Sequence, residues 1–216
     1  IPAMIEAAPA GGTVTIPAGT YNETLSISKT ITLIGASMYT TTLQPASTGQ
    51  RVIAVAAGKD LHLEGLKITG GQAAGDSGGG AYLADGSLTL TSCWIYLNSA
   101  GYGGGVFQAG AGRVLTATDS VIESNTAALH GGGIYVEGNF VFDGSTLIAN
   151  TAGWHGGGAH VDQGSAQLIF GTVTGNHATG GNGGGINTNN SLNILGTDFS
   201  GNTAGDSGGA LTQWNA

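Results

Sequence analysis

Residues 125–161 read NTAALHGGGIYVEGNFVFDGSTLIANTAGWHGGGAHV. An asparagine followed by a triple glycine occurs twice in this stretch: Asn125 precedes glycines 131–133, and Asn150 precedes glycines 156–158, a spacing of 25 residues. The same pairing recurs on both sides of the stretch. The third glycines of the five complete copies are Gly80, Gly105, Gly133, Gly158 and Gly185, and the asparagines are Asn98, Asn125, Asn150, Asn176 and Asn202. A fixed period of this length is typical of a solenoid.

Within each period, apolar and polar residues alternate over short runs such as 134–136, 140–142 and 145–148. Gly, Asn or Asp separates the runs, which predicts three short strands per period with turns between them. Each strand is expected to pair with its counterpart one rung away, about 4.8 Å distant. The sequence therefore predicts an all-β, single-stranded parallel β-helix, in which stacking of the rungs buries the core.

Alternation also assigns the residues that face inward. Leu88/Leu90, Leu115/Ala117, Phe140/Phe142, Leu168/Phe170 and Leu192/Ile194 are expected to fill the core from the second strand of each rung. Cys93, Ser120, Ser145 and Thr197 are expected to form a stack of small residues. Cys93 is then a buried small residue and not a nucleophile.

We expect one domain over residues 1–216, in three parts. Residues 1–12 form an N-terminal cap, with a short helix over 2–9 that covers the open edge of the first rung. Residues 13–70 form irregular first rungs, and residues 71–216 carry the Gly/Asn-rich repeats.

Composition excludes several classes of function. The 216 residues include 42 glycines and only five Lys plus Arg against 13 Asp plus Glu, for a net charge of −8. Binding to nucleic acid needs clustered cations, so no nucleic-acid partner is predicted. No apolar run is long enough to span a bilayer, so no membrane insertion by this segment is predicted. With few lysines and much Thr, Ser, Asn and Gly, the protein is expected to be extracellular or at the cell surface.

Two pairs of short stretches carry a resemblance to known families. Residues 19–25 (GTYNETL) and 29–35 (KTITLIG) resemble the opening of right-handed β-helix proteins of the pectin-lyase-like superfamily. Residues 199–202 (FSGN) and 208–211 (GGAL) resemble the repeats of chlamydial polymorphic outer-membrane proteins. The resemblance implies a right-handed β-helix, and the period of roughly 25 residues predicts about eight rungs. It does not imply an activity, because the superfamily contains lyases, hydrolases, esterases, epimerases and adhesins.

The repeated asparagines and glycines are interpreted as a structural ladder. Asparagine side chains bond nearby backbone groups, and glycine lets neighbouring chains approach closely. Stacked on successive rungs, they satisfy turn backbone that would otherwise be buried without a partner.

One outward column of the strand after the glycines is aromatic. Register places Tyr82, Phe107, Tyr135 and His160 there, followed by Asn187, while Tyr102, His130 and His155 each precede a triple glycine. The predicted ligand-binding residues are Tyr82, Tyr102, Phe107, Tyr135, Trp154 and His160. Aromatic faces along a groove suit a glycan or a protein surface. The alternative is a cross-strand ladder that protects backbone, and the sequence leaves both open.

An enzyme is the competing interpretation. Glu137 and Asp162 occupy equivalent places on adjacent rungs and have His130, His155 and His160 nearby, a set that suits acid–base chemistry on a polysaccharide. Calcium is expected only under this alternative, and otherwise no metal or cofactor is predicted. Neighbouring rungs offer only Ala84, Ala109 and Asn189 in the carboxylate column, and no Lys or Arg falls in these columns. The paired aspartates of polygalacturonases and the Gln/Asp pattern of pectin methylesterases find no match. No catalytic residue is therefore favoured.

The leading prediction is a non-catalytic extracellular module for adhesion, structure or filament assembly. Residues 209–216 stop partway into a rung without a capping helix. The chain is accordingly expected either to be an excerpt of a longer protein or to self-assemble head to tail through this rung.

Overall fold

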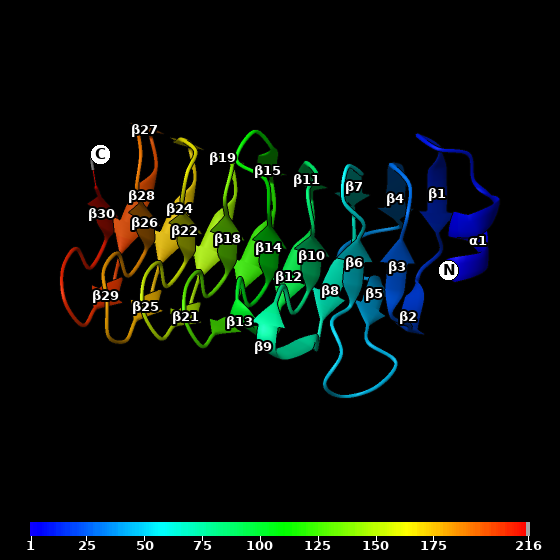
Figure 1. Cartoon of the computed structure of the whole chain (residues 1–216), viewed down its shortest axis with the longest axis horizontal. Coiled ribbons are helices and arrows are strands. Elements are labelled where there is room, and N and C mark those ends of the chain that lie inside the picture. Colours follow the sequence, from blue (N-terminus) through cyan, green and yellow to red (C-terminus); the bar gives the residue numbers. More distant parts are fainter. Residues whose placement is uncertain (215–216) are drawn as a thin grey trace.

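A computed structural model describes residues 1–214. The chain winds into one elongated parallel β-solenoid, with α1 (Pro2–Ala7) at one end and the C-terminal strand at the other (Figure 1). Three sheets of eight strands run the length of the solenoid, so the expected eight rungs are confirmed. No described helix is long and apolar enough to cross a membrane.

The strands of each sheet lie in chain order along the axis. Sheet A contains β1 (Thr13–Ile16), β4 (Ile31–Gly35), β7 (Leu61–Glu64), β11 (Leu88–Thr91), β15 (Val114–Thr118), β19 (Asn139–Asp143), β23 (Ala166–Ile169) and β27 (Leu192–Leu195). Sheet B contains β2 (Gly19–Asn22), β5 (Thr41–Gln44), β8 (Lys67–Thr69), β12 (Trp94–Tyr96), β16 (Val121–Glu123), β20 (Thr146–Ile148), β24 (Thr172–Thr174) and β28 (Asp198–Ser200). Sheet C contains β3 (Leu25–Ile27), β6 (Ile53–Val55), β10 (Ala81–Leu83), β14 (Val106–Gln108), β18 (Ile134–Val136), β22 (Ala159–Val161), β26 (Ile186–Thr188) and β30 (Leu211–Gln213).

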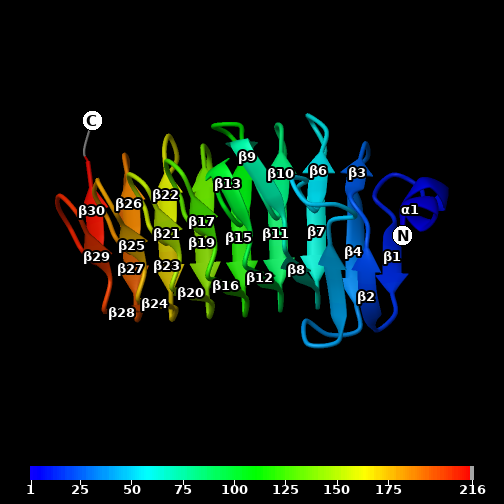
Figure 2. The same ribbon diagram turned by 90° about the horizontal axis from the view of Figure 1, so that it is seen from below.

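A fourth sheet was not predicted. Sheet D contains β9 (Gln72–Ser77), β13 (Ser99–Tyr102), β17 (Thr126–Ala127), β21 (Thr151–Ala152), β25 (His177–Ala178) and β29 (Thr203–Ala204). All of its strands except β9 directly follow a ladder asparagine, and Figure 2 shows β13, β17, β21, β25 and β29 side by side along the axis. The three predicted strands per rung are thus present throughout, and a short fourth strand is added to the rung from β9 onward. Four of the six strands of sheet D are only two residues long, too short for alternation to reveal them.

One repeat of the sequence corresponds to one rung. In sheet C, Ile134 pairs with Val106 on one side and with Ala159 on the other. In sheet A, however, Phe142 pairs with Leu168, and the predicted inward position of Phe170 is wrong. Phe170 follows β23 in the left-handed region at φ 48° and is 67% exposed.

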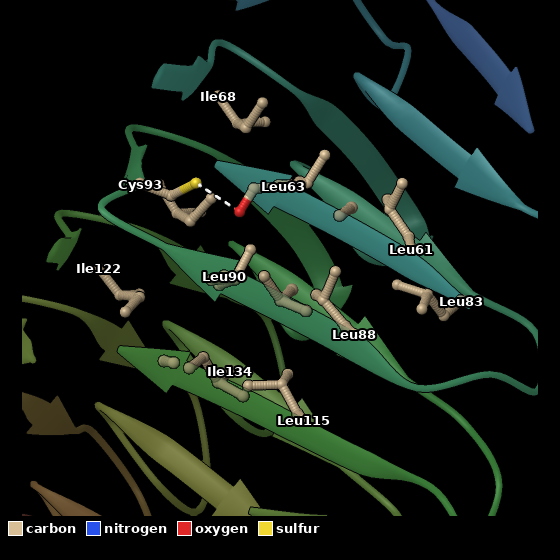
Figure 3. Packing of buried hydrophobic residues seen from close by; sticks show 14 of the residues in the cluster. Leu61, Leu63, Ile68, Leu83, Leu88, Leu90, Cys93, Leu115, Ile122 and Ile134 are labelled. Atoms are coloured by element: carbon tan, nitrogen blue, oxygen red, sulfur yellow. Dashed lines mark hydrogen bonds between the residues drawn. The ribbon is translucent and has the colours of Figure 1, made fainter. Parts of the chain in front are cut away.

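The core is a single column of aliphatic and phenyl side chains enclosed by the sheets (Figure 3). Cys93 belongs to it, and its thiol donates a hydrogen bond to the Leu63 carbonyl at 3.3 Å. Its backbone N–H donates to Ser120 Oγ, and Ser120 N–H donates to Ser145 Oγ, so the stack of small residues is present. Burial raises the pKa of the Cys93 thiol to about 12, which keeps it protonated and unreactive.

The helix α1 covers the N-terminal end of the core. It is shorter than the expected 2–9, because Ala8 is already extended. Ile5 is buried, and Lys29 Nζ donates to the carbonyls of Glu6 and Ala8 at the end of the helix. At the other end, Leu195 is 56% exposed on the last strand of sheet A. Residues 215–216 of the predicted final rung lie outside the described residues.

The asparagines form a continuous buried ladder. The backbone N–H and side-chain Nδ2 of Asn125 both donate to Asn150 Oδ1 at 3.0 Å, and Nδ2 also donates to the Ile95 carbonyl. Asn150 repeats the pattern toward Asn176 and Ile122. Each side-chain amide thus bonds backbone groups of the preceding rung and the asparagine side chain of the following rung, so its polar atoms are satisfied as burial requires.

The middle glycines touch the next rung directly. A Cβ on Gly157 would lie 2.4 Å from the Gly184 carbonyl oxygen and 2.5 Å from the carbonyl carbon of His177. Both neighbours are backbone and cannot rotate away. Any side chain here must therefore force two rungs apart.

We expect Gly157→Val to destabilise the protein by about 3 kcal/mol or more, because it disrupts stacking in the middle of the core. Gly112→Val is the matched control: a Cβ at Gly112 meets nothing within 4 Å. Urea unfolding of both variants measures the difference. Equal stabilities would contradict the close approach of the rungs.

Candidate functional site

The outer face of sheet C carries a column of stacked rings. Tyr82, Phe107, Tyr135 and His160 lie in register on β10, β14, β18 and β22. Ring centroids are 5.6 Å apart for Tyr82–Phe107, 5.1 Å for Phe107–Tyr135 and 5.1 Å for Tyr135–His160. The first two pairs are nearly parallel, at 13° and 12°. Such contacts add roughly 0.5–1.5 kcal/mol per pair beyond their buried area.

A second column leans over the first because of the glycine turns. Gly131 has φ 67°, and a Cβ there would lie 2.3 Å from the Ile134 carbonyl oxygen. The chain therefore passes tightly against β18, and the residue before the glycine is held above sheet C. Tyr102, His130, His155 and Asn182 occupy this place on successive rungs. The His130 ring lies 5.0 Å from the His155 ring and 5.2 Å from the His160 ring.

In the N-terminal half of the column on the outer face of sheet C, the aromatic rings pack face to face on one another. Both faces of Phe107 are covered by neighbouring rings, and the Arg51 guanidinium lies 4.6 Å from the Tyr82 ring centre. These rings form the cross-strand ladder that the sequence left as the alternative. Trp154 stacks on His155 at 5.8 Å with half of its surface exposed.

A hollow opens where the column changes from aromatic to polar residues. Its cavity volume is about 530 Å³, and it lies toward the C-terminal end of sheet C. The lining residues are Tyr102, His130, Tyr135, His155, His160, Asp162, Asn182, Asn187, Asn189 and Trp214. The sequence-predicted Tyr102, Tyr135, His130, His155, His160 and Asp162 are thus brought together, whereas Tyr82, Phe107, Trp154 and Glu137 lie outside the lining.

Sequence reasoning did not single out Asn182, Asn187, Asn189 and Trp214 as binding residues. The repeat spacing nevertheless places two of these asparagines in the same columns as the histidines. Asn182 precedes its triple glycine as His155 does, and Asn187 pairs with His160 in register.

The three histidines of the hollow are held in the neutral form. His130 Nδ1 accepts a hydrogen bond from the His155 backbone N–H at 3.3 Å, and His155 Nδ1 accepts one from the Asn182 N–H at 3.0 Å. Burial lowers the pKa of both imidazoles. His160 is only 5% exposed, and burial, with His130 next to it, lowers its pKa to about 4. At pH 7 these rings are neutral hydrogen-bonding groups.

Glu137 and Asp162 sit on adjacent rungs but bond in opposite directions along the axis. Glu137 Oε2 accepts from the Gly110 N–H at 2.8 Å, toward the N-terminal end. Asp162 Oδ1 accepts from Asn189 Nδ2 at 2.8 Å, toward the C-terminal end, and lies 4.0 Å from His160 Nε2. Each carboxylate therefore has a structural partner of its own, and both lie near the Tyr135 hydroxyl, whose pKa is raised by burial and by these two negative charges. Among residues 1–214, no three His, Cys, Asp or Glu side chains are placed to hold a metal ion.

Two side chains of the hollow contain buried polar atoms without a hydrogen-bond partner in the described chain. They are His160 Nδ1 and both amide atoms of Asn187. Buried amides and imidazoles are normally satisfied, so these atoms mark a place where the fold alone does not complete the bonding.

Comparison of the sequence with models of known protein families identifies the class of protein. A family model described as the right-handed β-helix region matches residues 46–204. This is well over half of the chain, and the chain therefore belongs to the right-handed β-helix proteins. No curated protein matches the sequence.

Solved structures agree on the fold. The pectin methylesterase from carrot is 11% identical with a TM-score of 0.54, covering 100% of this chain and 84% of that one. The pectin methylesterase from Yersinia enterocolitica is 11% identical with a TM-score of 0.48, covering 99% and 93%. The likeness to the carrot enzyme shows the predicted pectin-lyase-like fold and, at this identity, no activity. The resemblance to chlamydial outer-membrane repeats is not tested by these matches and stays a prediction.

We predict that His160 makes the fold sensitive to acid. Its folded pKa of about 4 lies below the ordinary value of 6.5, so the unfolded chain binds more protons between these values. The stability contribution is complete above about pH 6.5 and is lost as the pH falls toward 4, by about 2–3 kcal/mol. His160→Gln should flatten the pH dependence over this window, measured by urea unfolding at several pH values. His177→Gln, on β25 outside the hollow, is the comparison, and equal slopes for parent and His160→Gln would contradict the prediction.

Proposed function

We propose that this β-helix is a non-catalytic, extracellular glycan-binding module whose binding site is the hollow on sheet C. The observation that carries the proposal is the composition of the lining. Histidines, asparagines and one aspartate face the hollow beside Tyr102, Tyr135 and Trp214. This combination of polar and aromatic groups matches a sugar ring, whose hydroxyl groups form hydrogen bonds and whose C–H faces pack on aromatic rings.

Charge favours a neutral glycan over an acidic one. None of the five Lys and Arg residues, all within the described chain, lines the hollow. Arg51 is bound to Asp76, Arg113 to Asp85, and Lys67 lies over the rings of Trp94 and Tyr96. A polyuronate would bring its carboxylates toward Asp162 and toward a protein of net charge −8 without a cation to neutralise them.

The arrangement of the carboxylates supports binding without turnover. Glycoside hydrolysis needs two carboxyl groups that flank one bond, one as acid and one as base or nucleophile. Here only Asp162 reaches the hollow, and Glu137 is bonded to the Gly110 N–H away from it. Adhesion to neutral polysaccharide at a cell surface is the role that fits this site.

Trp154 and Trp214 provide a matched test. Trp214 lines the hollow, whereas Trp154 lies outside it, and both are about half exposed. In calorimetry with neutral hexasaccharides of glucose, xylose, mannose and galactose, we expect Trp214→Ala to weaken binding about tenfold, the loss of roughly 1.4 kcal/mol. Trp154→Ala should stay within about twofold of the parent.

A reducing-end assay on the same sugars and on oligogalacturonate separates binding from catalysis. We expect retention of a neutral sugar without new reducing ends. Turnover that Glu137→Gln abolishes would instead establish the enzyme, and the absence of binding to every neutral sugar would overturn the proposal.

A further inference from the structure

The floor of the hollow contains an unusual pair of side chains. His160 and Asn187 face each other on adjacent strands, β22 and β26. They are 5% and 0% exposed, and three of their polar atoms have no partner in the described chain. Within that part of the chain, Asn187 is the side chain whose donor and acceptor are both unpartnered.

A buried asparagine without hydrogen-bond partners lowers the stability of the free protein. A buried polar group without a partner loses its hydration and gains nothing in return. The other asparagines buried in the repeats, such as Asn125 and Asn150, have both amide atoms bonded to neighbouring rungs. Asn187 therefore does not serve the ladder, and its side chain lies among the residues that line the hollow.

Resting on the proposed function, we propose that Asn187 and His160 together recognise the free hydroxyl groups of one neutral sugar residue. Hydroxyls that accept from Asn187 Nδ2 and donate to Asn187 Oδ1 and His160 Nδ1 satisfy all three atoms. The proton of neutral His160 then lies on Nε2, on the side of Asp162 Oδ1 at 4.0 Å, which leaves Nδ1 as the acceptor. All three atoms are buried in the free protein, so entry of the sugar is accompanied by rotation of a lining side chain.

This arrangement predicts a chemical preference. A hydroxyl both donates and accepts, whereas a methyl ether only accepts. A fully O-methylated sugar leaves Asn187 Oδ1 and His160 Nδ1 unpaired, and a site that hydrogen-bonds a hydroxyl discriminates strongly against an analogue without it. Hydroxyl groups, and not the apolar faces of the sugar alone, therefore determine binding at the floor of the hollow.

The test uses the isosteric variant Asn187→Leu and the control Asn193→Leu, which changes an exposed asparagine of β27. In the free protein, Asn187→Leu removes the unpartnered amide and should raise Tm by about 2–6 °C. Asn193→Leu should shift it by about 1 °C or less. A fall of several degrees for Asn187→Leu would show that the amide stabilises the fold, and would overturn the inference.

Binding is measured by calorimetry with whichever neutral hexasaccharide the parent retains. We expect Asn187→Leu and the smaller Asn187→Ala each to weaken binding at least about 30-fold, and the O-methylated hexasaccharide to bind the parent as weakly. Asn193→Leu should bind like the parent. Unchanged affinity in both Asn187 variants would overturn this inference and leave the proposed function standing, whereas a parent that binds no neutral sugar would overturn the proposed function itself.

Discussion

The close approach of backbone between rungs is the constraint on which the whole structure depends. Parallel strands one rung apart lie about 4.8 Å from each other, and the turns between them must match that rise. At the middle glycines, a Cβ would fall within 2.6 Å of backbone atoms of the next rung. The buried asparagine ladder runs beside these turns and bonds the backbone groups that would otherwise lose water without gaining a partner. Glycine allows the backbones of adjacent rungs to come close, and asparagine forms the hydrogen bonds that their backbone groups then need. Neither repeat element is sufficient without the other.

The same constraint creates the candidate site. Because each first glycine turns the chain tightly against sheet C, the residue before it is held above the outward column of the next strand. Aromatic residues in both places give continuous ring contacts: Phe107 stacks on Tyr135, and Tyr102 meets Tyr135 edge to face. Smaller polar residues in both places, Asn182 and Asn187, do not fill the space, and the hollow opens there. The position of the hollow along the solenoid is thus determined by which side chains occupy two columns, and the backbone is nearly the same on every rung.

Periodicity predicted the rungs, the inward residues and the ladder, because these depend on spacing alone. It failed where a result depended on side-chain orientation or on very short elements. The two-residue strands of sheet D are too short to show alternation. Phe170 has the same predicted inward position as the buried Leu168, but the left-handed turn that follows β23 directs its side chain outward. Register placed Tyr82, Phe107 and Tyr135 in one column correctly, yet it could not indicate that the rings would stack on one another and cover their faces. Likewise, register placed Glu137 beside Asp162, but it could not predict that their side chains form hydrogen bonds in opposite directions along the axis.

The change of chemistry along one column is the strongest argument that the hollow has a function. A solenoid selected only for stability would gain from continuing the ring stack, since each additional aromatic pair contributes favourable contact at no cost in solvation. Here the stack gives way to a buried histidine whose Nδ1 has no hydrogen-bond partner and then to an amide without one, and such unpaired buried atoms cost stability. Natural proteins retain residues that lower stability mainly at functional sites. The fold is shared with the pectin methylesterase from carrot, which is 11% identical, so fold alone carries no activity to this chain. The local loss of stability at His160 and Asn187 is therefore more informative about function than the whole of the surrounding scaffold.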